Sequence, residues 1–298
     1  MHSKNGAYAP ARLVAIGSYG TSRATSSKAP ALLASLGLLT ACAATDAPSP
    51  SPSLSSPSLS SPSLPMPIPS PVLPSPSADP VAAPGRSDLA ARSDDFAGSH
   101  LDPAWQLFNR DMVHISLSGG ALHLVPPRSC VWFHRDRGPL LYKSVRGDFV
   151  VTAAVRARRA SDPEKPVGRL FQFGGLMARH GGASAENYVF NVVGERCGFL
   201  SVETKSTVDG HSSVEGPEWP SGDAELRICR VGARFRLYKR ALGARQWIEA
   251  VTYDRPDLPP ELQVGPFAYA YTEKPDLRAS FDWVRFAPAA GEADCTRD

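Results

Sequence analysis

The sequence lacks the patterns that would assign it to several classes of enzyme. Carboxylates nowhere alternate as Glu-x-Asp-x-Glu or a close variant, the arrangement that would bring the two acids of a glycosidase to one face of a strand. Gly-x-Ser-x-Gly, the turn that carries a hydrolase serine, is absent. No Cys-x-x-Cys or His-x-x-x-His spacing occurs, which argues against a zinc site. We therefore expect no catalysis by these mechanisms and no required cofactor.

Long apolar runs are missing as well. The run at residues 31–39 follows Arg23 and Lys28 and is too short to span a bilayer, which takes about 20 apolar residues. It ends at Cys42, in the order Leu-Thr-Ala-Cys. A cationic region, a short apolar region and a small-residue cleavage site form the layout of an export signal. We therefore predict that residues 1–41 are an export signal.

The cysteine at that cleavage point resembles the one in the lipobox of bacterial lipoproteins. The resemblance implies that the Cys42 thiol is acylated, palmitate included, and that the lipid anchors the protein in a membrane. Ala43, in place of an acidic residue, implies sorting to the outer membrane or the cell surface of the bacterial envelope. In the alternative interpretation, Cys42 follows an ordinary cleavable signal and carries no lipid.

Proline and serine dominate the segment that follows. Thirteen of the 29 prolines lie between Pro48 and Pro84, SPSLS is repeated, and Asp79 is the only charge. Proline has no N–H for helix or sheet bonding, and serine offers no apolar surface to bury, so this composition cannot form a packed core. We predict a disordered linker over residues 42–93, whose proline-rich tract at residues 48–84 would reach on the order of 100 Å at full extension.

The remaining part of the chain, residues 94–288, consists of short strand-like runs between turn residues, with no sustained helical period. Phe149, Val151, Ala153 and Val155 alternate along one such run, as one face of a strand does. Evenly spaced strands without helices predict an all-β fold, a two-sheet antiparallel sandwich, followed by a tail at residues 289–298. The predicted strands are residues 148–156, 170–177, 187–193, 198–204, 224–231, 234–239, 247–253, 264–271 and 278–286.

The order of several short motifs resembles a known family. The opening motif is Asp-Asp-Phe at residues 94–96 with Leu-Asp-Pro-Ala-Trp at residues 101–105, and the closing one is Phe-Asp-Trp-Val-Arg-Phe at residues 281–286. Gly-Gly-Leu-Met-Ala-Arg at residues 174–179 lies between them. The succession is similar to concanavalin A-like (laminin-G-like) jelly rolls of the DUF1349 group. The resemblance implies a jelly-roll sandwich and says far less about function.

Four cysteines remain besides Cys42. Export places them in an oxidising compartment, where they would form disulfides, and four cysteines allow three pairings. We favour Cys197–Cys229, because their strands are near neighbours along the chain, and Cys130–Cys295, which would staple the C-terminal tail.

The charge pattern gives no sign of a nucleic-acid partner. The net charge is +3, and the arginines of residues 156–159 and 227–236 are spaced as solvent-facing positions of strands. A nucleic-acid surface would need a concentrated basic patch with interleaved aromatic residues and a matching motif. Contact with anionic lipid headgroups or with a surface polysaccharide stays open.

Carbohydrate binding is the function that we favour. Sandwiches that hold sugars stack them on exposed aromatic rings and fix the hydroxyl groups with polar side chains. The rival functions are a non-catalytic protein-interaction or envelope-scaffold module, and a glycoside hydrolase with an unrecognised pair of acids. For Trp132 the alternative is packing in the core, which we also predict for Trp105, Trp247 and Trp283. The candidate ligand-binding residues are Trp132, His134, Arg135, Arg179, Asn187, Tyr188 and Trp219.

A structural calcium ion is a further interpretation. In related sandwiches the acidic N-terminal strand and the C-terminal strand lie side by side, and their carboxylates can hold an ion. Asp94, Asp95 and Asp282 match those places. Calcium takes six to eight oxygen ligands, and these side chains supply only part of that set. In the alternative, Asp94 and Asp95 solvate the end of a strand.

Overall fold

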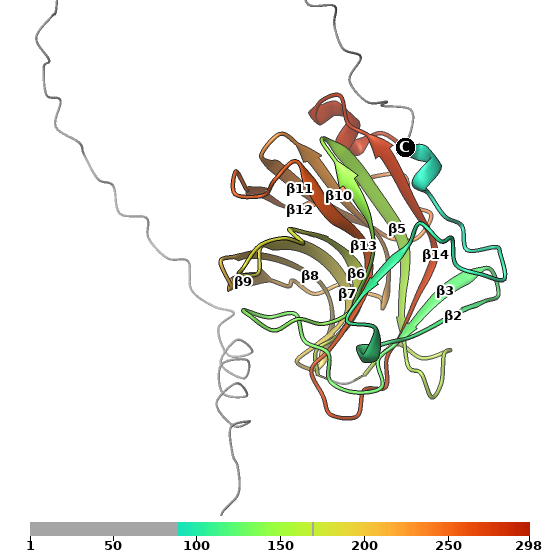
Figure 1. Cartoon of the computed structure of the whole chain (residues 1–298). Coiled ribbons are helices and arrows are strands. Elements are labelled where there is room, and N and C mark those ends of the chain that lie inside the picture. The colour runs from blue at the N-terminus through green and yellow to red at the C-terminus, as the bar shows by residue number, and fades with distance from the viewer. Residues whose placement is uncertain (1–88, 169) are drawn as a thin grey trace, which may run out of the picture. The chain divides into compact units, whose positions relative to one another are not determined.

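Two antiparallel sheets form the part of the chain that the structure, a computed structural model, describes: residues 89–168 and 170–298 (Figure 1). Each sheet has seven strands, so the predicted all-β sandwich is confirmed. The predicted signal, Cys42 and the proline-rich tract lie outside the described residues. None of the helical segments among the described residues has the length and hydrophobicity that a membrane span requires.

Sheet one contains, in spatial order, β1 (Gln106–Phe108), β4 (Leu140–Arg146), β13 (Glu261–Ala270), β6 (Gln172–Arg179), β7 (Tyr188–Arg196), β8 (Phe199–Val208) and β9 (His211–Glu215). Sheet two contains β12 (Ile248–Asp254), β11 (Arg234–Arg240), β10 (Asp223–Val231), β5 (Phe149–Arg158), β14 (Arg278–Pro288), β3 (Ala121–Val125) and β2 (His114–Ser118). Three short 3-10 turns accompany them: η2 (Ala90–Arg92), η3 (Arg110–Met112) and η4 (Glu292–Thr296).

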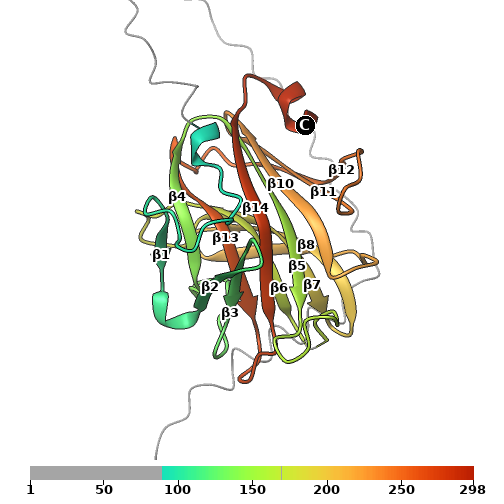
Figure 2. The same ribbon diagram turned by 90° about the vertical axis from the view of Figure 1, so that its right-hand side faces the viewer.

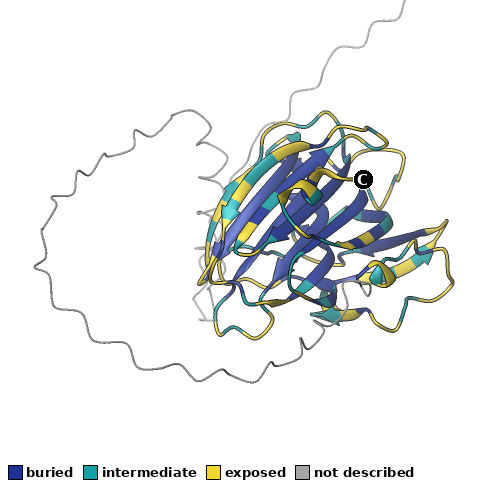
Figure 3. Cartoon of the chain, turned by 90° about the horizontal axis from the view of Figure 1, so that it is seen from above, coloured by how far each residue is buried: buried dark blue, intermediate teal, exposed yellow. Residues whose placement is uncertain are grey.

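The core lies between the two sheets. The four alternating residues predicted to share a face of β5, Phe149, Val151, Ala153 and Val155, are all fully buried in the main apolar cluster. Figure 3 shows the strands largely in the colour of buried residues and the connecting loops in the colour of exposed ones. The period-2 pattern therefore identified the inward face of this strand correctly.

Gly174 and Gly175 lie in β6 where backbones approach closely. The pairing of β6 with β7 and with β13 continues through both residues without a shift, so there is no bulge. A Cβ atom on Gly174 would lie 2.6 Å from the Cβ of Ala279, in the facing sheet. A Cβ atom on Gly175 would lie 2.2 Å from the backbone oxygen of Asn191 in β7. Glycine is thus required here for space rather than for an unusual turn.

A β-bulge interrupts β14 at Asp282. Phe281 pairs with Val155 of β5, whereas Trp283 pairs with the next residue, Ala154, so two residues of β14 oppose one step of β5. Because of this extra residue, Trp283 lies on the outer face of sheet two, although Phe281, two residues earlier, lies in the core. The bulge decides which side chains of β14 face solvent.

His123 of β3 gives a pH dependence that can be measured. Its ring is buried, with Nδ1 2.9 Å from Ser280 Oγ and Nε2 2.8 Å from Arg278 Nη2. Burial lowers the pKa of His123 below its ordinary value of 6.5, so the unfolded chain takes up this proton at a higher pH than the folded one. We expect the free energy of unfolding to decrease as the pH falls below about 6.5, and less steeply in His123→Gln.

Urea unfolding at several pH values between about 7.5 and 5 covers that titration range. His114→Gln is the matched control, because His114 is exposed on the adjacent strand β2. Identical pH slopes in the wild type and in His123→Gln would contradict the assignment.

Candidate ligand-binding site

The predicted sugar platform lies in the interior. Trp132 and Tyr188 are both fully buried, and their rings meet edge to face with centroids 5.5 Å apart. The indole Nε1 of Trp132 donates to the Pro139 carbonyl at 3.1 Å. Neither ring presents a face to solvent, so both residues are packed in the interior, as the alternative for Trp132 stated. Their rings lie under the loop before β4, outside the apolar cluster between the sheets.

The other predicted residues do not converge on one open groove. Arg179 is buried and holds Glu186 through two hydrogen bonds of 2.8 Å, and the Asn187 amide donates to Asp209 at 3.2 Å. His134 and Arg135 are exposed in the loop before β4. Trp219 is partly buried in the loop before β10, where its Nε1 donates to the Asp223 carbonyl.

A loop closes the outer face of sheet one. Lys205 Nζ donates to the Trp132 carbonyl at 2.8 Å and lies about 5 Å from the rings of Phe133, Phe190 and Tyr269. Its carboxylate neighbour Glu203 lies 3.8 Å away. Burial lowers the pKa of Lys205 to about 8 and raises that of Glu203. The Glu203 carboxylate is therefore enclosed on this face, and a sugar chain cannot reach it.

The three acids proposed for calcium bind other groups. Asp94 forms a bridge with Val284 of β14, which places the N-terminal segment beside the C-terminal strand as expected. Its carboxylate accepts a hydrogen bond from Trp105 Nε1 at 2.8 Å, and Asp282 pairs with Arg156 at 2.8 Å. Asp95 accepts from the Ala97 amide. No cluster of three or more metal-binding side chains occurs in residues 89–168 and 170–298, and calcium binding stays a prediction.

A disulfide links Cys229 of β10 to Cys295 of η4, and Cys130 is a buried free thiol. The predicted pairings Cys197–Cys229 and Cys130–Cys295 are therefore wrong. Cys130 forms an isolated β-bridge with Ala270 of sheet one, and Cys197 lies at the turn between β7 and β8 of the same sheet. Cys229, in contrast, belongs to sheet two. The predictions joined positions that different sheets hold apart.

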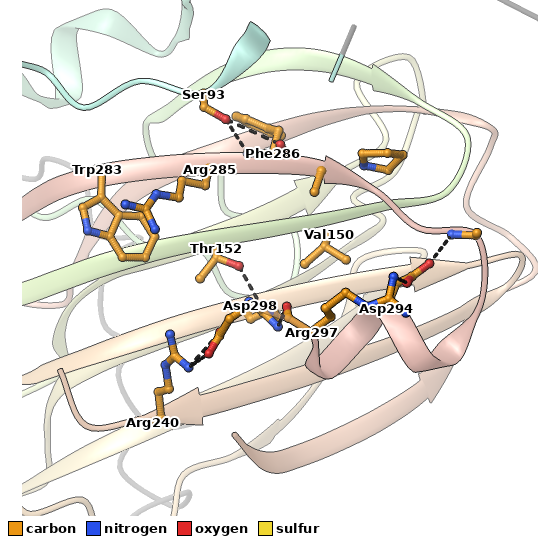
Figure 4. Close-up of a pocket in the computed structure, with 14 residues that line it drawn as sticks. Ser93, Val150, Thr152, Arg240, Trp283, Arg285, Phe286, Asp294, Arg297 and Asp298 are labelled. Atoms are coloured by element: carbon orange, nitrogen blue, oxygen red, sulfur yellow. Dashed lines mark hydrogen bonds and ion pairs between the residues drawn. The ribbon is translucent and has the colours of Figure 1, made fainter. Parts of the chain in front are cut away.

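A pocket of about 810 Å³ lies on the outer face of sheet two, within the range of about 300–1,000 Å³ typical of ligand sites. The register of the sheet explains it. Thr152 of β5 pairs with Arg227 of β10 on one side and with Arg285 of β14 on the other. Because Thr152 is short and its two neighbours are long arginines, the surface is hollowed at Thr152, which forms the floor of the pocket. Figure 4 shows the pocket, whose further lining residues are Ser93, Val150, Arg240, Trp283, Phe286, Ala287, Pro288, Ala290, Asp294, Arg297 and Asp298.

The C-terminal segment forms one wall of the pocket. Figure 2 shows η4 beside the upper ends of β10 and β14. The disulfide fixes this segment to β10, and Arg227 Nη1 donates to the carbonyls of Cys295 and Arg297, each at 2.9 Å. Burial lowers the pKa of Arg227 to about 10, so the guanidinium stays charged at neutral pH.

A carboxylate is already bound at that wall. The guanidinium carbons of Arg227 and Arg240 each lie 4.0 Å from the ring centroid of Trp247. Arg240 Nη1 donates to both carboxylate oxygens of Asp298, at 2.8 and 2.9 Å, and Trp247 Nε1 donates to one of them at 3.1 Å. Planar guanidinium groups match carboxylates in this way. We call Arg227, Arg240 and Trp247 the carboxylate seat.

The opposite wall carries a partly exposed aromatic ring. Trp283 comes from the β14 bulge, and the guanidinium of exposed Arg285 lies 4.3 Å from its ring centroid. Figure 4 shows the two side chains next to each other on β14. The prediction that Trp105, Trp247 and Trp283 all lie in the core therefore holds for the first two, at 7% and 9% exposure, and is wrong for Trp283.

Comparison with known proteins supports the fold. No family model and no curated protein matches the chain. A functionally unknown protein from Saccharomyces cerevisiae is similar in structure, with a TM-score of 0.53, 16% identity, and coverage of 63% of this chain and 98% of that one. The GH43 protein BlXynB from Bacillus licheniformis is also similar in structure, with a TM-score of 0.54 and 16% identity, and the match covers 66% of this chain and 39% of that one. The Bacteroides ovatus xyloglucan PUL GH43B has a TM-score of 0.52 and 17% identity, and the match again covers 66% of this chain and 39% of that one.

These identities show the fold alone, and the chain spans 39% of the length of either GH43 protein. A two-sheet all-β fold is thus shown, while membership of the DUF1349 group stays a prediction.

Proposed function

We propose that this protein is a lipid-anchored module of the bacterial cell envelope that binds carbohydrate in the pocket of sheet two. The observation that carries the proposal is Trp283, a partly exposed indole on the wall of a cavity of about 810 Å³. Aromatic rings supply a large rigid contact area for the apolar face of a sugar, and the indole N–H is available for a hydroxyl group. The likeness in fold to two GH43 proteins, which are carbohydrate-active, supports the same class of ligand.

The anchor in this proposal comes from the sequence around Cys42, and the proline-rich linker would hold the pocket away from the membrane surface. The module is proposed as non-catalytic, since Glu203, the buried acid on the outer face of sheet one, is enclosed with Lys205.

A polysaccharide array with the full chain in detergent tests the proposal. We expect the wild type to bind at least one glycan, and Trp283→Ala to bind it about tenfold more weakly, since a lost aromatic contact of about 1.4 kcal/mol corresponds to that factor. Trp283→Phe should keep most of the affinity. Trp219→Ala is the control, because Trp219 is also partly exposed but lies outside the pocket.

Two results would refute the proposal. One is a wild type that binds no polysaccharide, which would favour the protein-interaction alternative. The other is a Trp283→Ala variant with unchanged affinity. Release of reducing ends from a bound glycan, abolished by a single Glu→Gln change, would overturn the non-catalytic part.

A further inference from the structure

The charges that line the pocket of sheet two do not balance. Four arginines face two aspartates among its lining residues. Arg240 pairs with Glu225 at 2.6 Å and with Asp298 at 2.8 Å. Arg297 pairs with Asp294 at 2.6 Å, and Arg227 lies 3.6 Å from Asp298. No carboxylate in residues 89–168 and 170–298 pairs with the fourth, Arg285 (salt bridges within 4.0 Å).

Arg285 is also held in place. Its guanidinium lies over the Trp283 ring, with 4.3 Å between the guanidinium carbon and the ring centroid. Stacking on an aromatic face orients the planar group and leaves its N–H donors at the edge free for an anion. The bulge at Asp282 puts both side chains on the outer face of the sheet. This guanidinium, which has no ion pair within 4.0 Å among the described residues, is therefore next to the ring that we propose as the sugar platform. Asp94 and Asp95 line a neighbouring pocket with it.

The pocket also has apolar lining. Val150, Ala287, Pro288 and Ala290 contribute it, beside the Thr152 floor. A ligand for this site needs an apolar face for this surface and an acidic group for Arg285. A pyranose ring that carries a carboxylate has both features.

The carboxylate seat supports the choice of acid. It shows that the guanidinium of Arg240, together with the adjacent indole N–H of Trp247, binds a carboxylate with direct hydrogen bonds at this wall, since Asp298 occupies it at 2.8 to 3.1 Å. Arg285 offers the same planar donor group on the opposite wall, without an acid from the described residues.

We infer that the carbohydrate bound by this protein is acidic: it is a polysaccharide that contains uronic acid, and its carboxylate pairs with Arg285. This inference rests on the proposed function. Charge-assisted hydrogen bonds of this kind are about twice as strong as neutral ones, and they provide selectivity between acidic and neutral sugars. Neutral glycans lack the partner and would leave the Arg285 charge unpaired in the complex.

The test uses uronic acid polysaccharides printed beside their carboxyl-reduced forms, which keep the backbone but lose the acid. The full chain is assayed at about 150 mM salt, where long-range attraction between exposed charges is screened. We expect carboxyl reduction to weaken binding at least tenfold. Arg285→Gln should lower the affinity for the acidic form to that for the reduced form, and Arg285→Lys should keep part of the preference.

Arg146→Gln is the matched control, because Arg146 is an exposed arginine of β4 in sheet one and its loss changes the net charge equally. Equal loss of acidic binding in Arg146→Gln and Arg285→Gln would show a general charge effect and overturn the inference. Equal binding of acidic and reduced forms would overturn it as well, while leaving the proposed function intact. No binding to any polysaccharide, acidic or neutral, would instead refute the proposed function.

Discussion

Replacing Cys42 by serine is expected to move the protein from the membrane fraction to the soluble fraction. A serine hydroxyl does not take the place of the thiol in lipoprotein acylation, so the variant would lack acyl chains. Each buried methylene group of an acyl chain contributes about 0.8 kcal/mol to membrane binding, so their loss removes the proposed anchor. Fractionation of cells that express the full chain, with mass spectrometry of residue 42, measures both consequences.

Ala43→Asp is the companion variant. It keeps the Cys42 thiol, so the protein should remain lipidated and in the membrane fraction, while its sorting between the two membranes of the envelope should change. A Cys42→Ser protein that stays in the membrane fraction, or a wild type with residue 42 unmodified, would contradict the lipoprotein assignment. Both readouts are independent of glycan binding and therefore separate the location from the ligand.

Adding a single methyl group at Gly175 is expected to destabilise the domain severely. The new Cβ atom in Gly175→Ala would lie 2.2 Å from the Asn191 backbone oxygen and 2.6 Å from the Cα atom of Val192. Both atoms belong to the backbone of β7, which cannot move aside without breaking the ladder between β6 and β7. We expect a loss of about 3 kcal/mol or more in the free energy of unfolding, measured in urea.

Gly291→Ala is the control for this substitution. Gly291 has an extended backbone with φ −178°, and a Cβ atom there would have no neighbour within 4 Å. Its free energy of unfolding should stay within about 0.5 kcal/mol of the wild type. Equal stability of Gly175→Ala and Gly291→Ala would show that β6 and β7 can separate, contrary to the close approach in the structure.

The strongest pattern gave the clearest prediction. The alternation along β5 identified its buried face, and the predicted strands at residues 224–231 and 234–239 correspond to β10 and β11, where Val231 pairs with Arg234. The sequence-based list of strands omitted β1, β2, β3, β4 and β9. Residues of β2 and β9, at the edges of the two sheets, alternate between exposed and half-buried, so neither strand has a buried face to reveal. The list also missed β3 and β4, although most of their residues are buried.

The site was harder to predict than the fold. Regular alternation along β14 would place Trp283 on the same side of the strand as Phe281, in the core. The bulge at Asp282 turns the Trp283 side chain to the outer face instead. A bulge leaves no unique signal in a single sequence, because any residue of β14 can be the extra one. The opposite error concerned Trp132 and Tyr188, whose polar neighbours suggested a surface although both rings are fully buried.

The disulfide shows a similar limit. Distance along the chain favoured Cys197–Cys229, but the link observed joins Cys229 to Cys295, 66 residues later. Which cysteines meet depends on which sheet each strand joins and on how the C-terminal segment crosses β10. Neither the sheet that a strand joins nor the path of the C-terminal segment can be derived from the residues next to each cysteine.

The bridge between Asp94 and Val284 has a mechanical consequence for an anchored protein. Two hydrogen bonds of 2.8 Å join these residues, and the next contact is the Phe286 amide, which donates to Ser93 Oγ at 3.0 Å. Ser93 and Phe286 also line the pocket. If the protein is anchored through Cys42 as proposed, tension on the linker would enter the described domain at Leu89 and load this pair of backbone bonds early. Under the proposed function, force on the anchor would therefore strain the rim of the pocket and change the affinity for the proposed ligand.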